Sequence, residues 1–449
     1  MDLEKKNILI VGLGVTGLAM ARFLTTKGAF VTVTDTATER ELASAIPSVK
    51  AMGVRMELGG HRKETFTSAD MIILSPGVPH RLEPLRLAKE KGVPVWGEIE
   101  MAFRFIEEPI IAVTGTNGKT TTTVLLAEML KASGMTVFVG GNIGTPLIKY
   151  VRKGKRAQMV VAEVSSFQLD TIETFRPKIG VLLNITEDHL DRYENFDAYA
   201  NSKARLFENQ QSEDLAILNG SDATVMNISR SICSKKWLFN APSETCTGAT
   251  IEENRIVLHI GSGRRQYIDL SQVRLKSSHY AENAAAAGLA ALAAGGNLRG
   301  ISSAIKQFRG LPHRIEYVTT KHGVRFFNDS KATNIDAVQK ALISFKQPVI
   351  LIMGGRNKGG NFETLRAAVR SRVKKLVLMG EAASDIHKVL GRAAPAEIVS
   401  TMLQAVYCAK EAASPGDVVL LSPGCTSFDL YRNYEHRGDH FRSITQGLP

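Results

Sequence analysis

Residues 113–123 read VTGTNGKTTTT and continue directly from the apolar run IIAV at residues 110–113. A strand that ends in a glycine-rich turn and runs into a helix is typical of a phosphate-binding loop, because the amide groups at the helix start bind anions. The usual pattern G-x-x-x-x-G-K-[ST] requires glycine at position 113, where this chain has Val113. The context still predicts an ATP site, in which Lys119 neutralises phosphates and the Thr120 hydroxyl reaches a magnesium ion.

Two further strand ends supply residues suited to such a site. The run MVVAE ends in Glu163, and an acid at the end of a neighbouring strand can share a magnesium ion with Thr120. The strand GVLLNIT opens into EDHLDRY, which places His189 where ligands of open α/β sheets collect. We therefore expect Glu163 to bind the metal, and His189 to act as a ligand or base.

One lysine falls within an apolar helix face. The segment NFDAYANSKARLFENQ puts Phe196, Tyr199, Lys203 and Leu206 on one side at helical spacing. In one interpretation, Lys203 packs its stem and extends its amine to water. In the other, its amine is partly desolvated and nucleophilic enough to be chemically modified.

The N-terminal region carries a second glycine-rich turn. GLGVTG at residues 12–17 is a complete G-x-G-x-x-G between a strand and a helix, and Asp35 ends the next strand. The glycines let a diphosphate approach the helix N-terminus, and the acid can bind a ribose hydroxyl. This pattern predicts a nucleotide-like ligand. It leaves open a nicotinamide cofactor, as in a dehydrogenase, or a tight turn without a ligand.

Strands and helices alternate along most of the chain, which predicts an α/β protein with parallel sheets. NILIVG, FVTVTD, DMIILSPG and VPVWG read as strands in the first hundred residues; VRFFNDS, PVILIMGG, KKLVLMGE and DVVLLSPG do so near the C-terminus. Residues 215–275 look more like hairpins. Breaks in the rhythm predict three domains, at residues 1–97, 98–310 and 311–449.

Three strand ends of the last domain present polar side chains. Lys331 follows the first of these strands, Lys358 lies in the glycine-rich loop after the second, and Ser427 follows the last. Taken singly, each of these residues could simply lie in an ordinary surface loop. Together they suggest a second substrate held opposite the phosphate loop.

Composition narrows the class of protein. Of 449 residues, 44% are hydrophobic and 22% charged, as in ordinary globular proteins, and the four cysteines show no C-x-x-C spacing. The N-terminal apolar run resembles neither a signal peptide nor a membrane span, so we expect a cytoplasmic protein without membrane insertion. The net charge of +12 raises a nucleic-acid-dependent ATPase as an alternative. The basic cluster KYVRKGKR at residues 149–156 is not accompanied by an aromatic-interleaved motif of a recognised nucleic-acid module, so we expect no nucleic acid partner.

The whole chain resembles the Mur ligases. The motifs that carry the resemblance, in this order, are TGTNGKT, GNIGTPL, EVSSFQL, NITEDHLDRY, NSKARLF, PHRIEYV, FNDSKATN and SPGCTSFDLYRNYEHRGDHF. The likeness is strongest to the members that join D-glutamate to UDP-N-acetylmuramoyl-L-alanine, at the expense of ATP, in peptidoglycan precursor synthesis. It implies a Rossmann-like N-terminal domain, a P-loop ATPase-like central domain and a Rossmann-like C-terminal domain.

The resemblance also assigns site residues by position. For the UDP-substrate it implies Val15, Thr16, Asp35, Thr36, Ser75, Asn142, Ser165 and Gln168. For ATP it implies Gly115, Thr116, Asn117, Gly118, Lys119, Thr120, Thr121, Thr122, Asn283, Arg314 and Asp329. For D-glutamate it implies Thr333, Lys358, Ser427, Phe428 and Tyr434. The implied catalytic residues are Lys119, Glu163, His189, Lys203 and Lys331.

Two magnesium sites follow from the same resemblance. Thr120 and Glu163 would hold one ion, and His189 would hold the other together with Lys203, carbamylated by carbon dioxide. The protein is expected to be a monomer that acts on three small substrates, and its reaction is expected to proceed through an acyl phosphate intermediate. The alternatives are another Mur-type ligase, with a different amino acid, or a ligase that adds glutamyl tails to folate.

Overall fold

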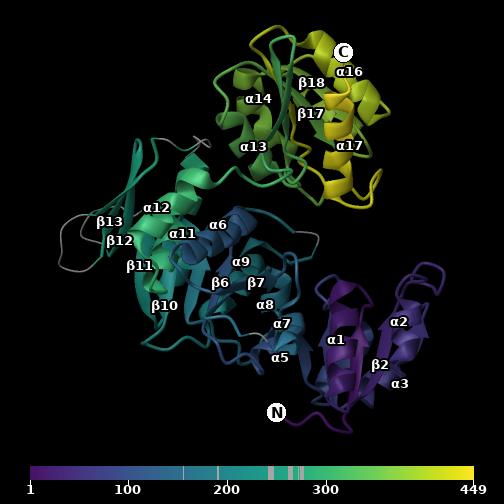
Figure 1. Cartoon of the computed structure of the whole chain (residues 1–449). Helices are drawn as coiled ribbons and strands as arrows, with labels where there is room; N and C mark the ends of the chain where they lie inside the picture. Colours follow the sequence, from purple (N-terminus) through teal and green to yellow (C-terminus); the bar gives the residue numbers. More distant parts are fainter. Residues whose placement is uncertain (155, 190–191, 241–246, 261–265, 272, 274–277) are drawn as a thin grey trace. The chain divides into compact units, whose positions relative to one another are not determined.

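The computed structural model of the protein describes residues 1–154, 156–189, 192–240, 247–260, 266–271, 273 and 278–449. The chain forms two compact units. The first comprises Met1–Asn184, Ala200–Ser271 and Asn283–Ile305, and the second comprises Ile185–Tyr199, Gln272–Glu282 and Lys306–Pro449. Two β-sheets belong to the first unit and one to the second (Figure 1). The expected α/β class with three sheet-containing domains is confirmed, whereas the boundaries near residues 97 and 310 stay predictions.

The first sheet is parallel, with strand order β3-β2-β1-β4-β5. Its strands are β1 (Asn7–Val11), β2 (Phe30–Asp35), β3 (Arg55–Leu58), β4 (Met71–Leu74) and β5 (Val95–Gly97). The helices of this region are α1 (Val15–Thr26), α2 (Ile46–Ala51), α3 (Lys63–Thr67), α4 (Glu83–Glu90) and α5 (Glu98–Phe103). The four expected strands are confirmed. The fifth, β3, was missed because RMEL has no apolar run.

The turn between β1 and α1 requires glycine at two of its three glycine positions, Gly12 and Gly17. Gly12 has a φ of +94°, which side chains rarely adopt, and a Cβ at Gly17 would lie 2.0 Å from the Gly12 carbonyl oxygen. The helix N-terminus therefore sits directly against the strand end. This is the geometry that the G-x-G-x-x-G pattern predicts.

Two buried carboxyl groups of α5 bind backbone amides of later segments. Glu98 is 1% exposed, and its Oε1 accepts a hydrogen bond of 2.7 Å from the amide of Ile148, in the first turn of α7 (Leu147–Lys153). Glu100 accepts hydrogen bonds from the amides of residues 173–175. Burial raises the pKa of Glu98 to about 7, against the opposing effect of the Ile148 and Leu147 amides.

The Glu98 carboxyl makes stability depend on pH in a definite direction. Between the ordinary pKa of 4.5 and about 7, the folded chain retains a proton that the unfolded chain releases, so stability falls as pH rises. Glu98→Gln removes this titration while keeping an acceptor for the Ile148 amide. Its stability relative to the parent is expected to rise from pH 4.5 to 8 by up to roughly 3 kcal/mol.

Thermal unfolding across that pH range tests this expectation. Glu128→Gln, at a half-exposed position on α6 (Lys119–Ala132), serves as the matched control. Parallel pH profiles for Glu98→Gln and the parent would show that Glu98 does not titrate in this window.

The second sheet has nine strands in the order β14-β13-β12-β11-β10-β9-β6-β8-β7. They are β6 (Ile110–Thr114), β7 (Val137–Gly141), β8 (Met159–Glu163), β9 (Ile179–Leu182), β10 (Leu215–Asn219), β11 (Lys235–Phe239), β12 (Gly248–Glu252), β13 (Arg255–His259) and β14 (Gln266–Asp269). Besides α6 and α7, the helices along this part of the chain are α8 (Ser166–Leu169), α9 (Phe196–Ala204), η1 (Arg205–Phe207), α10 (Ala223–Ser229), α11 (Ser278–Ala293) and α12 (Leu298–Gln307).

The expected hairpin character of residues 215–275 is only partly right. β12, β13 and β14 do pair antiparallel, but β10 and β11 are parallel and are connected through α10. The buried run LAILN in β10 is typical of a parallel strand covered on both faces. Residues 241–246, 261–265, 272, 274 and 275 of this stretch lie outside the described residues.

The third sheet, in the second unit, has strand order β15-β16-β20-β17-β18-β19, with β15 antiparallel to β16. Its strands are β15 (Glu316–Lys321), β16 (Val324–Asn328), β17 (Val349–Gly354), β18 (Val373–Met379), β19 (Ala396–Ile398) and β20 (Val418–Leu421). The helices are α13 (Ile335–Ile343), η2 (Phe362–Leu365), α14 (Arg366–Arg372), α15 (Ala383–Leu390), α16 (Met402–Ala412) and α17 (Tyr434–Gln446). All four strands expected here are confirmed.

Both faces of this third sheet are buried. Along β17, Leu351 packs into one hydrophobic cluster and Ile352 into another, as the alternation of side chains in a strand requires. The strand ends are therefore the positions where polar side chains remain available. Among the described residues, no helix combines the length and apolar character needed to cross a membrane.

Candidate active site

The phosphate loop connects β6 to α6 and explains the missing glycine. Val113 is fully buried within β6, where it pairs with Glu163 of β8 and Val181 of β9. The position is thus an ordinary strand residue with no need for glycine. Gly115 and Gly118, in contrast, have φ angles of +151° and +86°.

The loop packs against two asparagines. The backbone amide of Thr116 donates to the Asn184 carbonyl oxygen, and that of Asn117 to the Asn184 Oδ1, each at 2.9 Å. A Cβ at Gly118 would lie 2.4 Å from Oδ1 of Asn283, so the predicted ATP residue Asn283 does contact the loop. Asn184 was missed because a single asparagine after a strand carries no distinctive sequence signal.

Two lysine amines converge on this loop. Lys119 Nζ donates to the carbonyl oxygens of Gly115 and Thr116, both at 2.8 Å. Lys203 Nζ donates to the same Gly115 oxygen at 2.9 Å, and the residue is only 1% exposed. The interpretation in which Lys203 extends its amine to water is therefore wrong. The structure instead has a buried amine beside the loop.

Glu163 has an oxygen suited to a cation. The residue is 2% exposed at the end of β8, and its Oε1 accepts a hydrogen bond of 2.8 Å from Asn142 Nδ2. Its Oε2 is buried and has no hydrogen-bond partner within the described part of the chain. A buried carboxylate oxygen without a partner is costly, and a divalent cation would satisfy it. Glu163 thus fits the magnesium site predicted for it.

The other threonines of the loop lie at the start of α6. Thr120 and Thr121 occupy its first turn, and Thr122 is fully buried with its Oγ1 among the atoms without a partner in the described chain. The structure thus places all the predicted loop residues of the ATP site along one strand–turn–helix segment.

A cavity of about 640 Å³ lies at the carboxyl ends of the first sheet. Of the residues predicted for the UDP-substrate, all except Ser165 line it; these are Val15, Thr16, Asp35, Thr36, Ser75, Asn142 and Gln168. Ser165 lies beside Gln168 and caps α8, in a capping box with that residue. The lining also includes His61, which the sequence interpretation missed because it lies after the unrecognised strand β3.

Asp35 organises this cavity through the backbone. Its Oδ2 accepts a hydrogen bond of 2.7 Å from the Leu13 amide, and its Oδ1 one of 2.9 Å from the Ala37 amide. The carboxylate therefore connects the glycine-rich turn after β1 to the loop after β2.

In the second unit, a smaller cavity of about 220 Å³ contains an ion pair. Lys358 Nζ and Asp188 Oδ1 are 2.9 Å apart, and Asn334 Nδ2 donates to Asp188 Oδ2 at 2.9 Å. Burial alone would raise the pKa of Asp188, but the charges of Lys358 and His189 and the hydrogen bonds lower it to about 2. Thr333 also lines this cavity, as predicted for an amino-acid site.

The remaining D-glutamate candidates lie outside that cavity lining. Ser427 is 2% exposed and Phe428 is 63% exposed in the loop after β20. Tyr434 begins α17, and its ring centroid is 3.7 Å from Lys331 Nζ, a cation–π contact. His189, with a φ of +56°, donates its amide to Asp188 Oδ1.

A buried arginine links two loops of this unit. Arg437 is 3% exposed; its guanidinium donates to Ser330 Oγ at 2.9 Å and to the carbonyl oxygens of Ser330, Cys425 and Thr426. Burial lowers its pKa to about 10. These contacts connect the loop that carries Lys331 to the loop that carries Ser427. Arg437 was not predicted, because its role depends on contacts distant in sequence.

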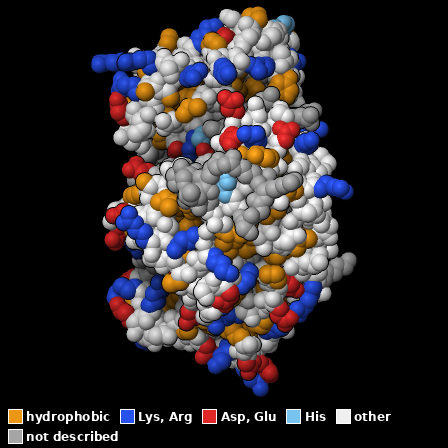
Figure 2. Space-filling view, turned by 90° about the vertical axis from the view of Figure 1, so that its left-hand side faces the viewer, with side chains coloured by type: hydrophobic (Ala, Val, Ile, Leu, Met, Phe, Trp, Pro, Cys, Tyr) orange, Lys and Arg blue, Asp and Glu red, His pale blue; other side chains and the backbone are white. Residues whose placement is uncertain are grey.

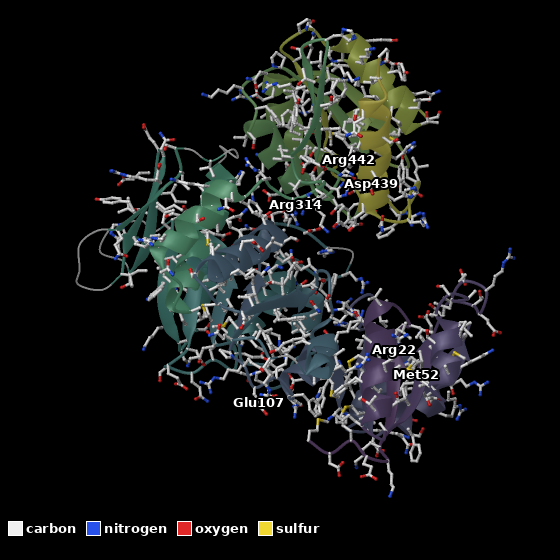
Figure 3. The ribbon with its side chains drawn as sticks, in the orientation of Figure 1. Arg22, Met52, Glu107, Arg314, Asp439 and Arg442 are labelled. Atoms are coloured by element: carbon white, nitrogen blue, oxygen red, sulfur yellow. The ribbon has the colours of Figure 1, made fainter. Side chains whose placement is uncertain are left out.

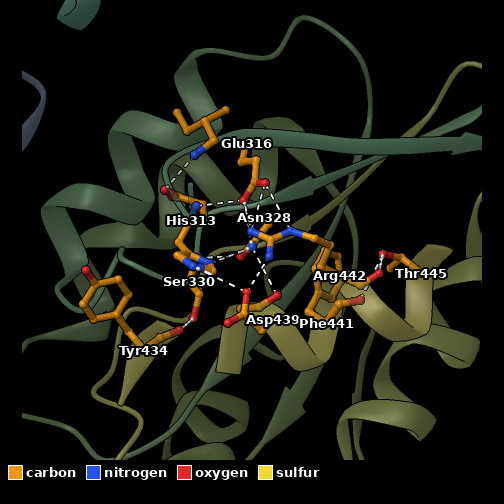
Figure 4. A network of polar contacts seen from close by, with 12 residues as sticks. His313, Glu316, Asn328, Ser330, Tyr434, Asp439, Phe441, Arg442 and Thr445 are labelled. Carbon is orange, nitrogen blue, oxygen red and sulfur yellow. Dashed lines mark hydrogen bonds and ion pairs between the residues drawn. The ribbon is translucent and has the colours of Figure 1, made fainter. Parts of the chain in front are cut away.

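Next to these loops lies the polar network of Figure 4. Asn328 Nδ2 is 3.0 Å from His313 Nδ1 and 3.2 Å from Glu316 Oε2, and Arg442 binds the Glu316 carboxylate through two nitrogens. Arg442 also pairs with Asp439 of α17 (Figure 3). The network holds the start of the third sheet against α17.

Asp329 and Arg314, both predicted to contact ATP, belong to this second unit. Asp329 is 6% exposed, and its two oxygens accept hydrogen bonds from Ser422 Oγ and the Ile315 amide. Burial raises its pKa to about 7 against those hydrogen bonds and the Arg314 charge. Arg314 is labelled in Figure 3. The ATP roles of both residues stay predictions.

Models of three domain families match the chain. "Mur ligase MurD-like, N-terminal domain" matches residues 6–97, "Mur ligase middle domain" residues 113–291, and "Mur ligase, glutamate ligase domain" residues 313–425. Together these matches cover most of the chain.

Curated relatives match over the full length. A UDP-N-acetylmuramoylalanine–D-glutamate ligase of Desulfosudis oleivorans is 50% identical over 448 residues, covering 100% of this chain and 98% of the relative. The protein of that name from Desulfatibacillum aliphaticivorans is also 50% identical, with 100% of both chains covered. Another, from Geotalea daltonii, is 43% identical over 100% of this chain and 99% of its own.

Solved structures share the fold at low identity. A pseudomurein peptide ligase type C from Methanothermus fervidus gives a TM-score of 0.62 at 20% identity, with 99% of this chain and 100% of that chain covered. A UDP-N-acetylmuramate-alanine ligase from Thermotoga maritima gives 0.60 at 18% identity, over 98% and 99%. These similarities support the architecture described above.

Proposed function

The chain belongs to the Mur ligase family, and from this membership we propose that it joins D-glutamate to UDP-N-acetylmuramoyl-L-alanine in an ATP-dependent amide synthesis. The observation that carries the proposal is full-length identity of 50% to ligases named for that reaction. The product would serve peptidoglycan precursor synthesis.

The chemistry requires an activated carboxyl group, because a carboxylate is a poor electrophile. The alanyl carboxylate attacks the γ-phosphate of ATP, the bond from that phosphorus to the bridging oxygen breaks, and acyl phosphate and ADP form. The D-glutamate amine then attacks the acyl carbon, loses a proton and displaces inorganic phosphate. The amides at the start of α6 and the Lys119 ammonium bind and orient the phosphates, and they stabilise the charge on the transferring group.

Magnesium fits the residues beside the loop. Thr120 and Glu163 would hold one ion, since the buried Glu163 Oε2 needs a partner. Magnesium supplies neutralisation of phosphate charge in reactions of this kind. A second ion, assigned by resemblance to His189 and Lys203, stays part of the proposal.

Carbamylation would change the charge of Lys203 from positive to negative. The neutral amine attacks carbon dioxide, forms a carbon–nitrogen bond and releases a proton, which leaves a carboxylate on Nζ. Burial beside the loop supports this, because desolvation favours the neutral and nucleophilic form of an amine.

The cavity of the second unit suits an amino acid. Lys358 and Asp188 face each other across 2.9 Å, so a zwitterionic ligand could replace that pair with its own carboxylate on the lysine and its own ammonium on the aspartate. Thr333 adds a hydroxyl at the same cavity. We assign D-glutamate to this cavity.

The proposal also includes the location, oligomeric state and partners of the protein. We expect a cytoplasmic monomer that takes three small substrates and no nucleic acid. On the face shown in Figure 2, acidic side chains are interspersed with basic ones, unlike a continuous basic surface for a phosphate backbone.

Substrate-dependent phosphate release tests the proposed function. With ATP, magnesium and UDP-N-acetylmuramoyl-L-alanine, the protein is expected to release phosphate with D-glutamate and at background rates with L-glutamate, L-lysine or diaminopimelate. Equal release with any of these would overturn the assignment of the amino acid. Release with a reduced folate as the acceptor, in place of the UDP-substrate, would favour the alternative folate ligase.

A further inference from the structure

His61 lines the 640 Å³ cavity and follows the edge strand β3. The cavity lining includes Gly12 after β1, Asp35 after β2, His61 after β3 and Ser75 after β4. Since β3 is the edge strand in the order β3-β2-β1-β4-β5, His61 follows the outermost strand on that side of the sheet.

Hydrogen bonds determine which ring nitrogen of His61 carries the proton. His61 Nδ1 is 2.9 Å from Thr34 Oγ1, and the same Oγ1 is 3.1 Å from the Gly60 carbonyl oxygen. A carbonyl oxygen can only accept, so the single hydroxyl proton of Thr34 goes to Gly60. The Thr34 oxygen must then accept from His61, which requires the Nδ1–H tautomer.

The other nitrogen, Nε2, is consequently an acceptor. It has no partner within the described residues and is not among the buried unpartnered atoms, so it is accessible. Burial lowers the pKa of His61 despite the opposing charge of Asp35, which favours the neutral ring. The side chain therefore presents a lone pair at the cavity.

The backbone around His61 is firmly held. The Gly59 amide donates to the Ala37 carbonyl oxygen at 3.0 Å, and the Gly60 amide to the Asp35 carbonyl oxygen at 3.2 Å. The ring also packs edge-on against Phe66, with centroids 5.6 Å apart. A hydrogen-bond acceptor held in one orientation can discriminate between a ligand that presents a donor and one that presents an acceptor, whereas a mobile side chain can adapt to both.

The direction of the substrate follows from the two ends of the cavity. Gln168 lies near the opposite edge, because the Gly97 amide at the end of β5 donates to the carbonyl oxygen of Thr171, three residues after Gln168. The alanyl end must reach the phosphate loop after β6 of the second sheet. Gln168 lies in α8, which follows β8 of the same sheet. With the diphosphate at the turn after β1, the nucleoside extends past β2 to β3.

We infer that His61 selects the base of the substrate, its Nε2 accepting a hydrogen bond from the imide N3–H of uracil. Cytosine presents an unprotonated N3 there and would leave two acceptors facing each other. The inference rests on the proposed function, since it takes the cavity ligand to be a uridine diphosphate sugar.

Calorimetric binding to full-length protein tests this without catalysis. The ligands are UDP-N-acetylmuramoyl-L-alanine and its 3-methyluridine and 2′-deoxyuridine counterparts. Methylation at N3 is expected to weaken binding to the parent roughly tenfold or more, and to change binding to His61→Phe by less than about twofold. His387→Phe, at an exposed histidine of α15, is the control and should behave like the parent.

Thr34→Val provides a second arm that keeps the His61 ring. Without the Thr34 oxygen, Nδ1 loses its acceptor, so ¹⁵N shifts of the labelled imidazole are expected to change from the Nδ1–H form to a mixture of tautomers. Discrimination against the 3-methyl ligand should fall in parallel. A merely structural role of His61 would leave this discrimination intact in both variants.

The outcomes separate the inference from its premise. If the parent binds none of the UDP ligands, the proposed function fails. If it binds them, and His61→Phe or Thr34→Val still discriminates against N3 methylation as the parent does, the inference is overturned. The inference would also be overturned if His61→Phe lost discrimination only against the 2′-deoxy ligand, because Nε2 would then contact the ribose.

Discussion

Lys119→Ala is expected to lower the turnover number by ~10²- to 10³-fold, with a smaller effect on the Michaelis constant for D-glutamate. Lys119 follows the left-handed Gly118 at the start of α6, and its amine reaches back over the loop to the Gly115 and Thr116 carbonyl oxygens. The same position lets it neutralise charge on a phosphate bound at the helix N-terminus. That charge grows in the transition state, so the loss falls mainly on turnover.

Steady-state kinetics of phosphate release measure this effect. The control is Lys131→Ala, which removes a lysine of the same helix that pairs with Glu128 at the surface. It should change turnover by less than about twofold, since exposed ion pairs contribute little. Near-normal turnover of Lys119→Ala would exclude the phosphate role of Lys119.

Lys203→Ala is expected to lose most of its activity and to regain part of it with added short-chain carboxylates such as formate or acetate. The residue is buried, and its amine contacts Gly115 of the phosphate loop. Truncation leaves a space into which a small carboxylate can bind, and this carboxylate would substitute for the proposed carbamate. A lysine acting only as a cation would not be replaced by an anion.

Lys119→Ala is the matched control for this rescue, because its missing group is an ammonium beside the same carbonyl oxygen. Formate and acetate should not restore its activity. Carbon-13 NMR of the parent protein under labelled carbon dioxide provides a direct readout, with a carbamate signal expected in the parent and absent in Lys203→Ala. Normal turnover of Lys203→Ala, or equal rescue of both variants, would contradict the carbamate.

Much of the fold was predictable because its signals are local. Several expected strands of the first and third sheets, such as β1 and β17, are buried apolar runs followed by a glycine or a polar turn, and local periodicity is enough to identify such runs. β3 was missed because Arg55 and Glu57 interrupt it. The parallel pairing of β10 with β11 was missed because pairing depends on contacts between segments rather than on either segment alone.

In the candidate site, too, residues with a local sequence signal were predictable and residues that depend on distant contacts were not. Lys119 and Glu163 were predictable, since one follows a glycine-rich turn and the other ends a buried strand. Three other residues were not predictable. Asn184 and Arg437 act through partners that lie far from them in the sequence, and His61 follows a strand that the sequence pattern does not reveal.

By itself the sequence determined the α/β class, the family and the residue types available for phosphate transfer, because these depend on short-range pattern and on motif order. Only the tertiary structure decided that Val113 pairs with both β8 and β9, that Lys203 is buried and shares the Gly115 oxygen with Lys119, and that Glu163 has an oxygen without a hydrogen-bond partner among the described residues. Burial and hydrogen-bond partners arise when distant segments pack together. The chemistry of a lysine or a carboxylate depends on that environment rather than on its place in the chain.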